Sequence, residues 1–161
     1  MKKIIFALAA ISLGFAACQK EQPTIDVSKT KYLMDGYWQL KGYTTNANYE
    51  DSSSTDVDQY GTLPNCLTDN LYRFRSASDF VVYEQDLKCD VTQPDSTEMF
   101  WQLNSEETNL KVYKDQADID NTLFWSGDMT YTSIDTFVLT YLYTDSGSGI
   151  TERRKATYVK L

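Results

Sequence analysis

The side chains in this sequence that could carry out acid–base chemistry are mainly carboxylates, because its 161 residues include no histidine. That absence removes Ser-His and Cys-His nucleophile pairs, histidine-containing metal sites and the side chain most used for proton transfer near neutral pH. Two opposed carboxylates could still hydrolyse a glycosidic bond. Most acidic residues, however, lie in polar segments that we expect to be exposed loops. We therefore predict that the protein is not an enzyme; the alternative, an acid-only hydrolase, requires two inward-facing carboxylates in a cleft.

One acidic segment, residues 51–58, has the composition of a cation-binding loop. It reads Asp-Ser-Ser-Ser-Thr-Asp-Val-Asp, and hard cations such as Ca²⁺ take clustered oxygen ligands. The segment lacks the glycine and the terminal glutamate of an EF-hand loop. A solvated loop is the favoured interpretation, and no metal or other cofactor is predicted.

The N-terminal segment is typical of a secretory signal. Met1-Lys2-Lys3 is basic, and residues 4–17 are almost wholly apolar. This apolar run is shorter than the roughly 20 residues that span a bilayer as a helix. We expect a signal peptide over residues 1–17, and cleavage nearby as an ordinary secretory signal is the alternative.

The end of this segment indicates a lipid anchor. Ala16-Ala17-Cys18 resembles the bacterial lipobox, whose cysteine receives a diacylglycerol and becomes the mature N-terminus, although Phe15 stands where Leu, Val or Ile is usual. Gln19-Lys20-Glu21-Gln22 resembles the export signal of surface lipoproteins of the Bacteroidota, with Gln22 in place of a second acid. We expect lipidated Cys18 and a tether over residues 18–32 to hold the protein at the bacterial outer membrane. Periplasmic and cell-surface orientations both stay open.

The charge of the mature chain argues against nucleic acid as a partner. Without residues 1–17, which carry two lysines and no acid, 13 basic and 23 acidic residues remain, a net charge of −10. Such a surface repels phosphate backbones and anionic lipid headgroups. No nucleic-acid partner is predicted.

The remaining two cysteines flank a predicted β-hairpin. Residues 71–74 and 80–83 are rich in aromatic and β-branched residues and are separated by turn-forming residues. Cys66 and Cys89 stand beyond the open end of this hairpin, and in an oxidising compartment an isolated pair is most simply a disulfide. Such a bond would stabilise the fold by about 3–3.5 kcal/mol. Two buried free thiols are the alternative.

The alternation of apolar and polar residues predicts eight strands in one domain over residues 33–161. They cover residues 36–43, 71–74, 80–83, 98–103, 109–114, 122–131, 136–144 and 150–161. A short helical turn is expected between Ser28 and Met34, and a β-bulge at Ser126-Gly127.

The connections between these strands alternate in length. The first, third, fifth and seventh (44–65, 87–97, 114–121 and 145–149) are mostly long and polar, and the second, fourth and sixth (76–78, 104–107 and 132–135) are tight. In an up-and-down meander, such connections gather at opposite ends and make a cup. A Greek-key sandwich gives no reason for this alternation. We therefore predict an all-β fold: an eight-stranded up-and-down antiparallel barrel.

These features resemble the lipocalin-like lipoproteins of the Bacteroidota. Gly36-Tyr37-Trp38 at the first strand, the long first connection and the meander carry the resemblance over roughly residues 33–161. It implies that Gly36 and Trp38 form the barrel floor and that Lys160 packs over the tryptophan. The sequence departs from the family in its 132–135 loop and in lacking a helix after the last strand, so no ligand is carried over.

Alternating aromatic residues give two hypotheses for function. Phe74, Phe80, Trp101, Tyr141 and Tyr158 would line an apolar pocket if the interior is not filled. The protein would then bind a small apolar or amphipathic ligand at the open end. The alternative is a filled barrel that binds a protein or glycan through rim loops 44–65, 87–97 and 114–121.

Overall fold

A computed structural model of the chain describes residues 28–161 apart from residues 77 and 120. The predictions for the signal peptide, Cys18 and tether residues up to 27 lie outside the described residues. In the described part, no helix is both long and apolar enough to cross a membrane. The elements are α1 (Lys29–Met34), β1 (Trp38–Asn46), β2 (Val57–Asp58), η1 (Tyr60–Thr62), α2 (Asn65–Thr68), β3 (Leu71–Phe74), β4 (Asp79–Tyr83), β5 (Ser96–Leu103), β6 (Asn109–Tyr113), β7 (Leu123–Ser133), β8 (Thr136–Thr144) and β9 (Thr151–Lys160).

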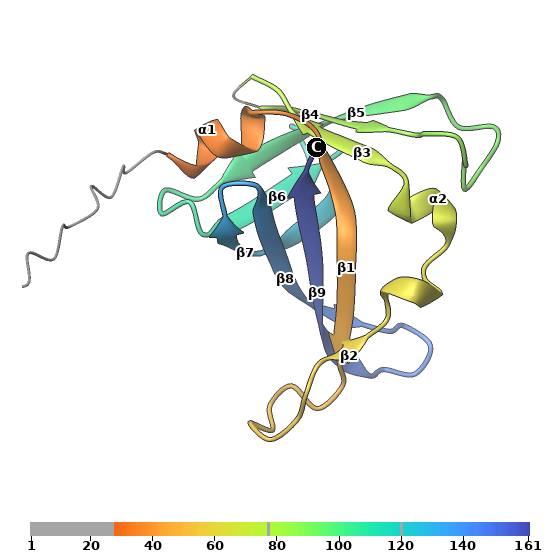
Figure 1. Cartoon of the computed structure of the whole chain (residues 1–161), viewed down its shortest axis with the longest axis vertical. Coiled ribbons are helices and arrows are strands. Elements are labelled where there is room, and N and C mark those ends of the chain that lie inside the picture. The colour runs from red at the N-terminus through yellow and green to blue at the C-terminus, as the bar shows by residue number, and fades with distance from the viewer. Residues whose placement is uncertain (1–27, 77, 120) are drawn as a thin grey trace, which may run out of the picture.

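Eight of the strands form a closed antiparallel up-and-down barrel (Figure 1). β1 closes it by pairing with both β3 and β9, and the β1–β9 ladder runs from Trp38 opposite Lys160 to Asn46 opposite Arg153. The two-residue strand β2 pairs with the end of β1. Closure removes the free edges that an open sheet would expose. The predicted fold class is confirmed.

The strand boundaries follow the hydrophobic alternation closely. β8 covers residues 136–144 as predicted, while β1 begins at Trp38 and continues to Asn46. The bulge of β7 lies at Phe124, which has no partner in the register between β6 and β7. The prediction of a bulge at Ser126-Gly127 is wrong, because both residues pair in register with β6.

The segment between β2 and β3 fills a gap in the barrel wall. β1 pairs with β3 only through Trp38 and Gln39, because β3 is short. The rest of this edge of β1 receives hydrogen bonds from residues 59 and 60: the Gln59 amide donates to the Tyr43 carbonyl at 2.9 Å and the Tyr60 hydroxyl to the Leu40 carbonyl at 3.0 Å. The prediction that residues 44–65 form one exposed loop is therefore wrong. Only residues 47–56 form the connection between β1 and β2.

The barrel interior is packed with aromatic rings. Seven of these side chains are at most 6% exposed, namely Trp38, Tyr72, Phe74, Phe80, Trp101, Phe137 and Tyr158. Ring centroids lie 4.8 Å apart for Trp38 and Phe137, and 5.0 Å apart for Phe137 and Tyr158. Aromatic pairs at such distances contribute about 0.5–1.5 kcal/mol beyond the burial of their area.

Candidate functional site

The two ends of the barrel differ in how they are closed. The tight connections β3–β4, β5–β6 and β7–β8 lie at the end that carries α1. The connections β1–β2, β4–β5, β6–β7 and β8–β9 lie at the other end. Figure 1 shows α1 and the C-terminus at the first end, and β2 with the β8–β9 hairpin at the second. We call these the closed end and the mouth.

Trp38 is at the centre of the closed end. Its indole is fully buried, and its Nε1 donates to the Leu33 carbonyl at 2.8 Å, which fixes α1 against the closed end of the barrel. Gly36 has φ 120°, and a Cβ there would lie 3.2 Å from the Lys160 side chain. Glycine is therefore suited to this position both by its backbone conformation and by the close approach of Lys160. Gly36 and Trp38 thus lie where the lipocalin-like resemblance places a floor.

Lys160 lies directly opposite Trp38 in the β1–β9 ladder. Its Nζ contacts Asp135 Oδ1 at 2.9 Å and Asp35 Oδ2 at 3.4 Å. The hydrogen bond that Lys160 donates to Asp135 raises the pKa of Lys160, and Asp35 adds to the effect. This ion pairing joins the β7–β8 turn and the start of β1 to the last strand.

The N-terminus of helix α1 is attached to the barrel mainly by the Glu107 carboxylate. Glu107, in the β5–β6 turn, accepts hydrogen bonds from the Ser28 hydroxyl at 2.5 Å, the Lys29 amide at 2.6 Å and the Thr30 hydroxyl at 2.9 Å. The Tyr131 hydroxyl donates to the Lys29 carbonyl at 3.1 Å. Lys29 to Tyr32, which the sequence analysis placed in the tether, are thus part of the folded body, and the closed end carries a capped helix.

The predicted pocket-lining residues are brought together, but four of them form the core. Phe74, Phe80, Trp101 and Tyr158 are between 0% and 4% exposed. Phe74 contacts Phe80 with a centroid separation of 4.9 Å and Trp101 with one of 5.1 Å. These rings fill the middle of the barrel, and none of them lines any of the five main hollows of the described residues. The filled interior is the alternative that the sequence left open.

Tyr141, the fifth predicted residue, lies instead at the mouth. It lines a hollow of about 280 Å³ together with Phe124, Trp125, Ser126, Tyr143 and Arg154. Phe124 is 40% exposed and Tyr143 is 38% exposed. The ring of Trp125 connects this hollow to the core, since its centroid is 5.2 Å from that of Phe80 and 5.1 Å from that of Tyr158. We call these six lining residues the mouth site.

The sequence analysis named only Tyr141 of the mouth site, and Phe124 in particular could not be assigned to it because it breaks the alternation of its strand. Phe124 is the bulged residue of β7, which places it beside Trp125 with the two rings stacked at 5.3 Å. A pattern of period two assigns such neighbours to opposite faces. Aromatic clustering at residues 123–125 was the available signal.

Arg154 supplies the charge of the mouth site. Its guanidinium lies 3.4 Å from the centre of the Tyr143 ring, and its Nη2 is 2.7 Å from Glu152 Oε1. The partly buried guanidinium therefore keeps its charge and its orientation. Burial raises the pKa of nearby Tyr43, and the Tyr141 hydroxyl adds to this rise, so the Tyr43 phenol stays protonated at neutral pH. The mouth site thus combines ring faces and tyrosine hydroxyl groups with a guanidinium that is paired to Glu152.

The first rim loop, residues 47–56, is fastened to the outer face of β9. Asp56 Oδ1 accepts from Arg153 at 2.8 Å, and Asp56 Oδ2 accepts from Lys155 at 2.6 Å. These two hydrogen bonds lower the pKa of Asp56 to about 2. Asp51, another acid of the segment considered for a cation, accepts from the amide and hydroxyl of Ser53. The 51–58 segment thus uses these carboxylates for protein contacts.

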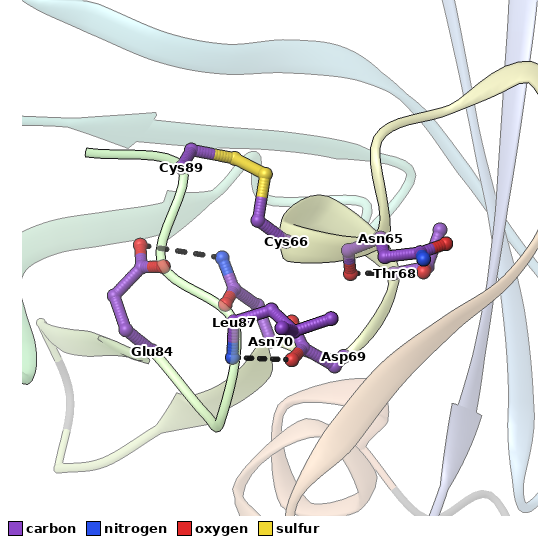
Figure 2. The surroundings of a disulfide bond; sticks show 8 residues. All are labelled: Asn65, Cys66, Thr68, Asp69, Asn70, Glu84, Leu87 and Cys89. Atoms are coloured by element: carbon purple, nitrogen blue, oxygen red, sulfur yellow. Dashed lines mark hydrogen bonds between the residues drawn. A yellow bond between two sulfur atoms is a disulfide. The ribbon is translucent and has the colours of Figure 1, made fainter. Parts of the chain in front are cut away.

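The predicted disulfide between Cys66 and Cys89 is present, with the two Cα atoms 5.1 Å apart. Cys66 belongs to α2, and Cys89 to the long β4–β5 connection, as Figure 2 shows. The bond therefore joins the segment that seals the barrel wall to the second rim loop.

Comparison of the sequence with protein-family models and with curated proteins gives no match. The function therefore has to be inferred from the fold and from the chemistry of the site.

Proposed function

We propose that this protein is an envelope-anchored, lipocalin-like binding protein that holds a small amphipathic ligand at the mouth of its barrel. The observation that carries the proposal is the contrast between the two regions of aromatic residues. The inner rings are buried against one another, whereas Phe124 and Tyr143 remain 40% and 38% exposed around a hollow. Exposed rings grouped around a few polar groups are the usual form of a small-molecule site.

The chemistry of the mouth site narrows the ligand class. A flat or aliphatic ligand surface would lie against Phe124, Trp125 and Tyr143. Arg154 would donate to an acceptor group at one end of the ligand, most favourably an anionic one, because a guanidinium binds carboxylates in two-point geometry. A ligand about the size of the 280 Å³ hollow would leave the filled core unchanged.

A titration with mouth variants tests the proposal. Amphipathic anions, beginning with 1-anilinonaphthalene-8-sulfonate and medium-chain carboxylates, would be titrated against the full chain. We expect Phe124→Ala and Tyr143→Ala each to weaken binding about tenfold, because each removes a ring contact worth about 1–1.5 kcal/mol. Ile134→Ala is the matched control, since Ile134 is 59% exposed at the β7–β8 turn of the closed end. Equal affinity of the native chain and both mouth variants would contradict the proposal.

A second candidate function is recognition of a protein or glycan by the rim loops. It is favoured by the fixed conformation of loop 47–56, which the Asp56 contacts hold against β9. A pre-organised loop binds a partner with a smaller entropic cost than a mobile one. A deletion that tests this candidate has to stay within residues 48–54. Removing all of 44–65 would also remove the end of β1 and the segment that seals the wall.

We also propose that lipidated Cys18 anchors the barrel at the outer membrane. The support is the resemblance of Ala16-Ala17-Cys18 to a lipobox. A diacylated N-terminus holds a protein stably because each buried CH₂ contributes about 0.8 kcal/mol. Growth with labelled palmitate should label the native chain and leave Cys18→Ala unlabelled. Equal labelling of the two chains, or none in either, would count against the anchor.

A further inference from the structure

Three buried oxygen atoms beside the disulfide have no hydrogen-bond donor. They are Asp69 Oδ1, Asn70 Oδ1 and Glu84 Oε2; each is inaccessible to solvent and has no partner among the described residues. Asn70 as a whole is only 3% exposed. A buried oxygen left without a partner destabilises the fold, and does so more strongly when it carries charge. An arrangement of three such atoms therefore calls for a ligand that satisfies them.

The fold brings the three residues near one another from two segments. The β3–β4 register pairs Leu71 with Tyr83, and extending it by one residue sets Asn70 opposite Glu84. Asn70 Nδ2 donates to Glu84 Oε1 at 3.3 Å, which turns the amide toward this carboxylate. Asp69 Oδ2 accepts from the Leu87 amide at 3.1 Å. Figure 2 shows the three side chains grouped between α2 and the chain that leaves β4.

No basic side chain neutralises this group. The ion pairs of the described residues involve neither Asp69 nor Glu84. The two carboxylates thus direct negative charge into one partly buried region without a counter-ion.

We propose that Asp69, Asn70 and Glu84 bind a divalent cation, and that the cation is Ca²⁺. The free atoms are all hard oxygen ligands, and two carboxylates balance a charge of +2. The described chain has no group of three or more acidic or cysteine side chains suited to a metal, so the amide oxygen of Asn70 provides the third ligand and water completes the shell. Ca²⁺ accepts such an irregular mixture of carboxylate, amide and water, whereas Mg²⁺ demands near-ideal octahedral geometry.

The position of the site indicates what the cation does. Asp69 and Asn70 follow α2, and Glu84 follows β4. These are the segments that the Cys66–Cys89 disulfide joins. Bound Ca²⁺ is thus a second link between the wall-sealing segment and the rim loop, with the affinity of about 10⁻⁴–10⁻³ M that is typical of extracellular modules.

Thermal unfolding of the full chain tests the site. The protein would be stripped with a chelator and titrated with CaCl₂, MgCl₂ or NaCl at matched ionic strength. At a Ca²⁺ concentration ten times the dissociation constant, we expect the midpoint to rise by about 3–5 °C. Mg²⁺ should give a much smaller rise and NaCl none. A Ca²⁺ response no larger than that of Mg²⁺ would show only general screening of an acidic protein and would overturn the proposal.

Variants with side chains of equal volume test whether the Ca²⁺-dependent rise of the midpoint comes from this site. Glu84→Gln removes one ligand charge without changing the volume, so it should abolish the Ca²⁺ shift. In the chelated protein, it should also raise the midpoint above that of the native chain, because it relieves an unpaired buried charge. Glu98→Gln is the matched control, since the Glu98 side chain is 80% exposed on β5. Sensitised Tb³⁺ luminescence gives a second reading of occupancy that does not depend on stability. Equal Ca²⁺ shifts or equal Tb³⁺ signals in Glu84→Gln and Glu98→Gln would reject the site.

Discussion

At the scale of single residues, Asp56 shows how one carboxylate can fix a loop. It pairs with Arg153 and Lys155, and these contacts lower its pKa to about 2 from an ordinary value near 3.8. A carboxylate with a depressed folded-state pKa stabilises the fold above its unfolded pKa, and this contribution is lost as the pH falls through the folded value.

We therefore expect Asp56→Asn to lower the free energy of unfolding by about 1–2 kcal/mol at pH 7, after allowing for solvent screening of the partly exposed pairs. The difference between variant and native chain should shrink between about pH 4 and pH 2. Urea unfolding at several pH values measures it. A constant difference across this range would mean that the charge of Asp56 is not the cause.

From the sequence, the inward direction of the core side chains could be predicted, but the volume left between them could not. Alternation correctly indicated that Phe74, Phe80, Trp101 and Tyr158 share the inner face, and all four are buried. Whether facing rings leave a cavity depends on how they pack across the barrel, and strand periodicity contains no such information. The Asp69, Asn70 and Glu84 group was equally hidden, because Glu84 lies 14 residues after Asn70 in the sequence. Only the hairpin register reveals that Asn70 faces Glu84.

At the scale of elements, the first turn of α1 is held mainly by one distant residue. Glu107 holds the Ser28 and Thr30 hydroxyls and the Lys29 amide, and the hydrogen bond from Ser28 is the main cause of its lowered pKa. Since α1 has six residues, it is too short to be stable alone.

Glu107→Ala should therefore loosen the first turn of α1 and cost about 1–2 kcal/mol of unfolding free energy. Hydrogen exchange should show faster exchange at residues 29–34 and little change in the strands. Glu106→Ala, an exposed neighbour in the same turn, serves as the control. Equal protection of α1 in the two variants would contradict this role for Glu107.

Gly127 sets the approach of β7 to β8. A Cβ at this position would lie 2.5 Å from the Thr140 carbonyl oxygen, which is closer than atoms of this kind can pack. Gly127→Ala should destabilise the barrel by about 1–3 kcal/mol. Gly61→Ala should have a small effect, because nothing lies within 4 Å of a Cβ there. Comparing the thermal midpoints of the two variants checks the prediction, and similar losses in both would refute it.

The strands could be predicted from the sequence because each has an apolar face, but the wall-sealing segment could not. Residues 59–70 contain turns and short helices with no period, so they read as a loop. Their role follows from a tertiary fact, the limited contact between β1 and β3. Tyr60 and Leu63 pack against the core only because that gap exists.

At the scale of the whole molecule, the Cys66–Cys89 disulfide holds the wall-sealing segment, residues 59–70, in place. It connects residues that are 23 positions apart. Replacing Cys66 and Cys89 together with alanine should lower the free energy of unfolding by about 3 kcal/mol, mainly by enlarging the unfolded ensemble. Denaturant unfolding of the double variant and of the native chain, without reductant, measures this loss. An unchanged midpoint would show that the seal is held by its other contacts.

The whole molecule has a filled barrel, a helix-capped closed end and a mouth that keeps aromatic surface exposed. The alternation of long and short connections along the sequence predicted this cup. The strands form the closed barrel that such a cup requires. The central claim is that binding occurs at the mouth and leaves the filled interior unchanged.

The three tryptophans allow a direct test of that claim, because Trp38 and Trp101 are 0% and 2% exposed in the core while Trp125 lines the mouth site. The measurement is the ¹H–¹⁵N spectrum of the three indole groups, assigned with Trp→Phe variants, during titration with 1-anilinonaphthalene-8-sulfonate. We predict that the Trp125 signal shifts with saturation while the signals of Trp38 and Trp101 stay in place. A shift of the Trp101 signal as large as that of Trp125, or saturable binding that leaves Trp125 unmoved, would contradict the claim.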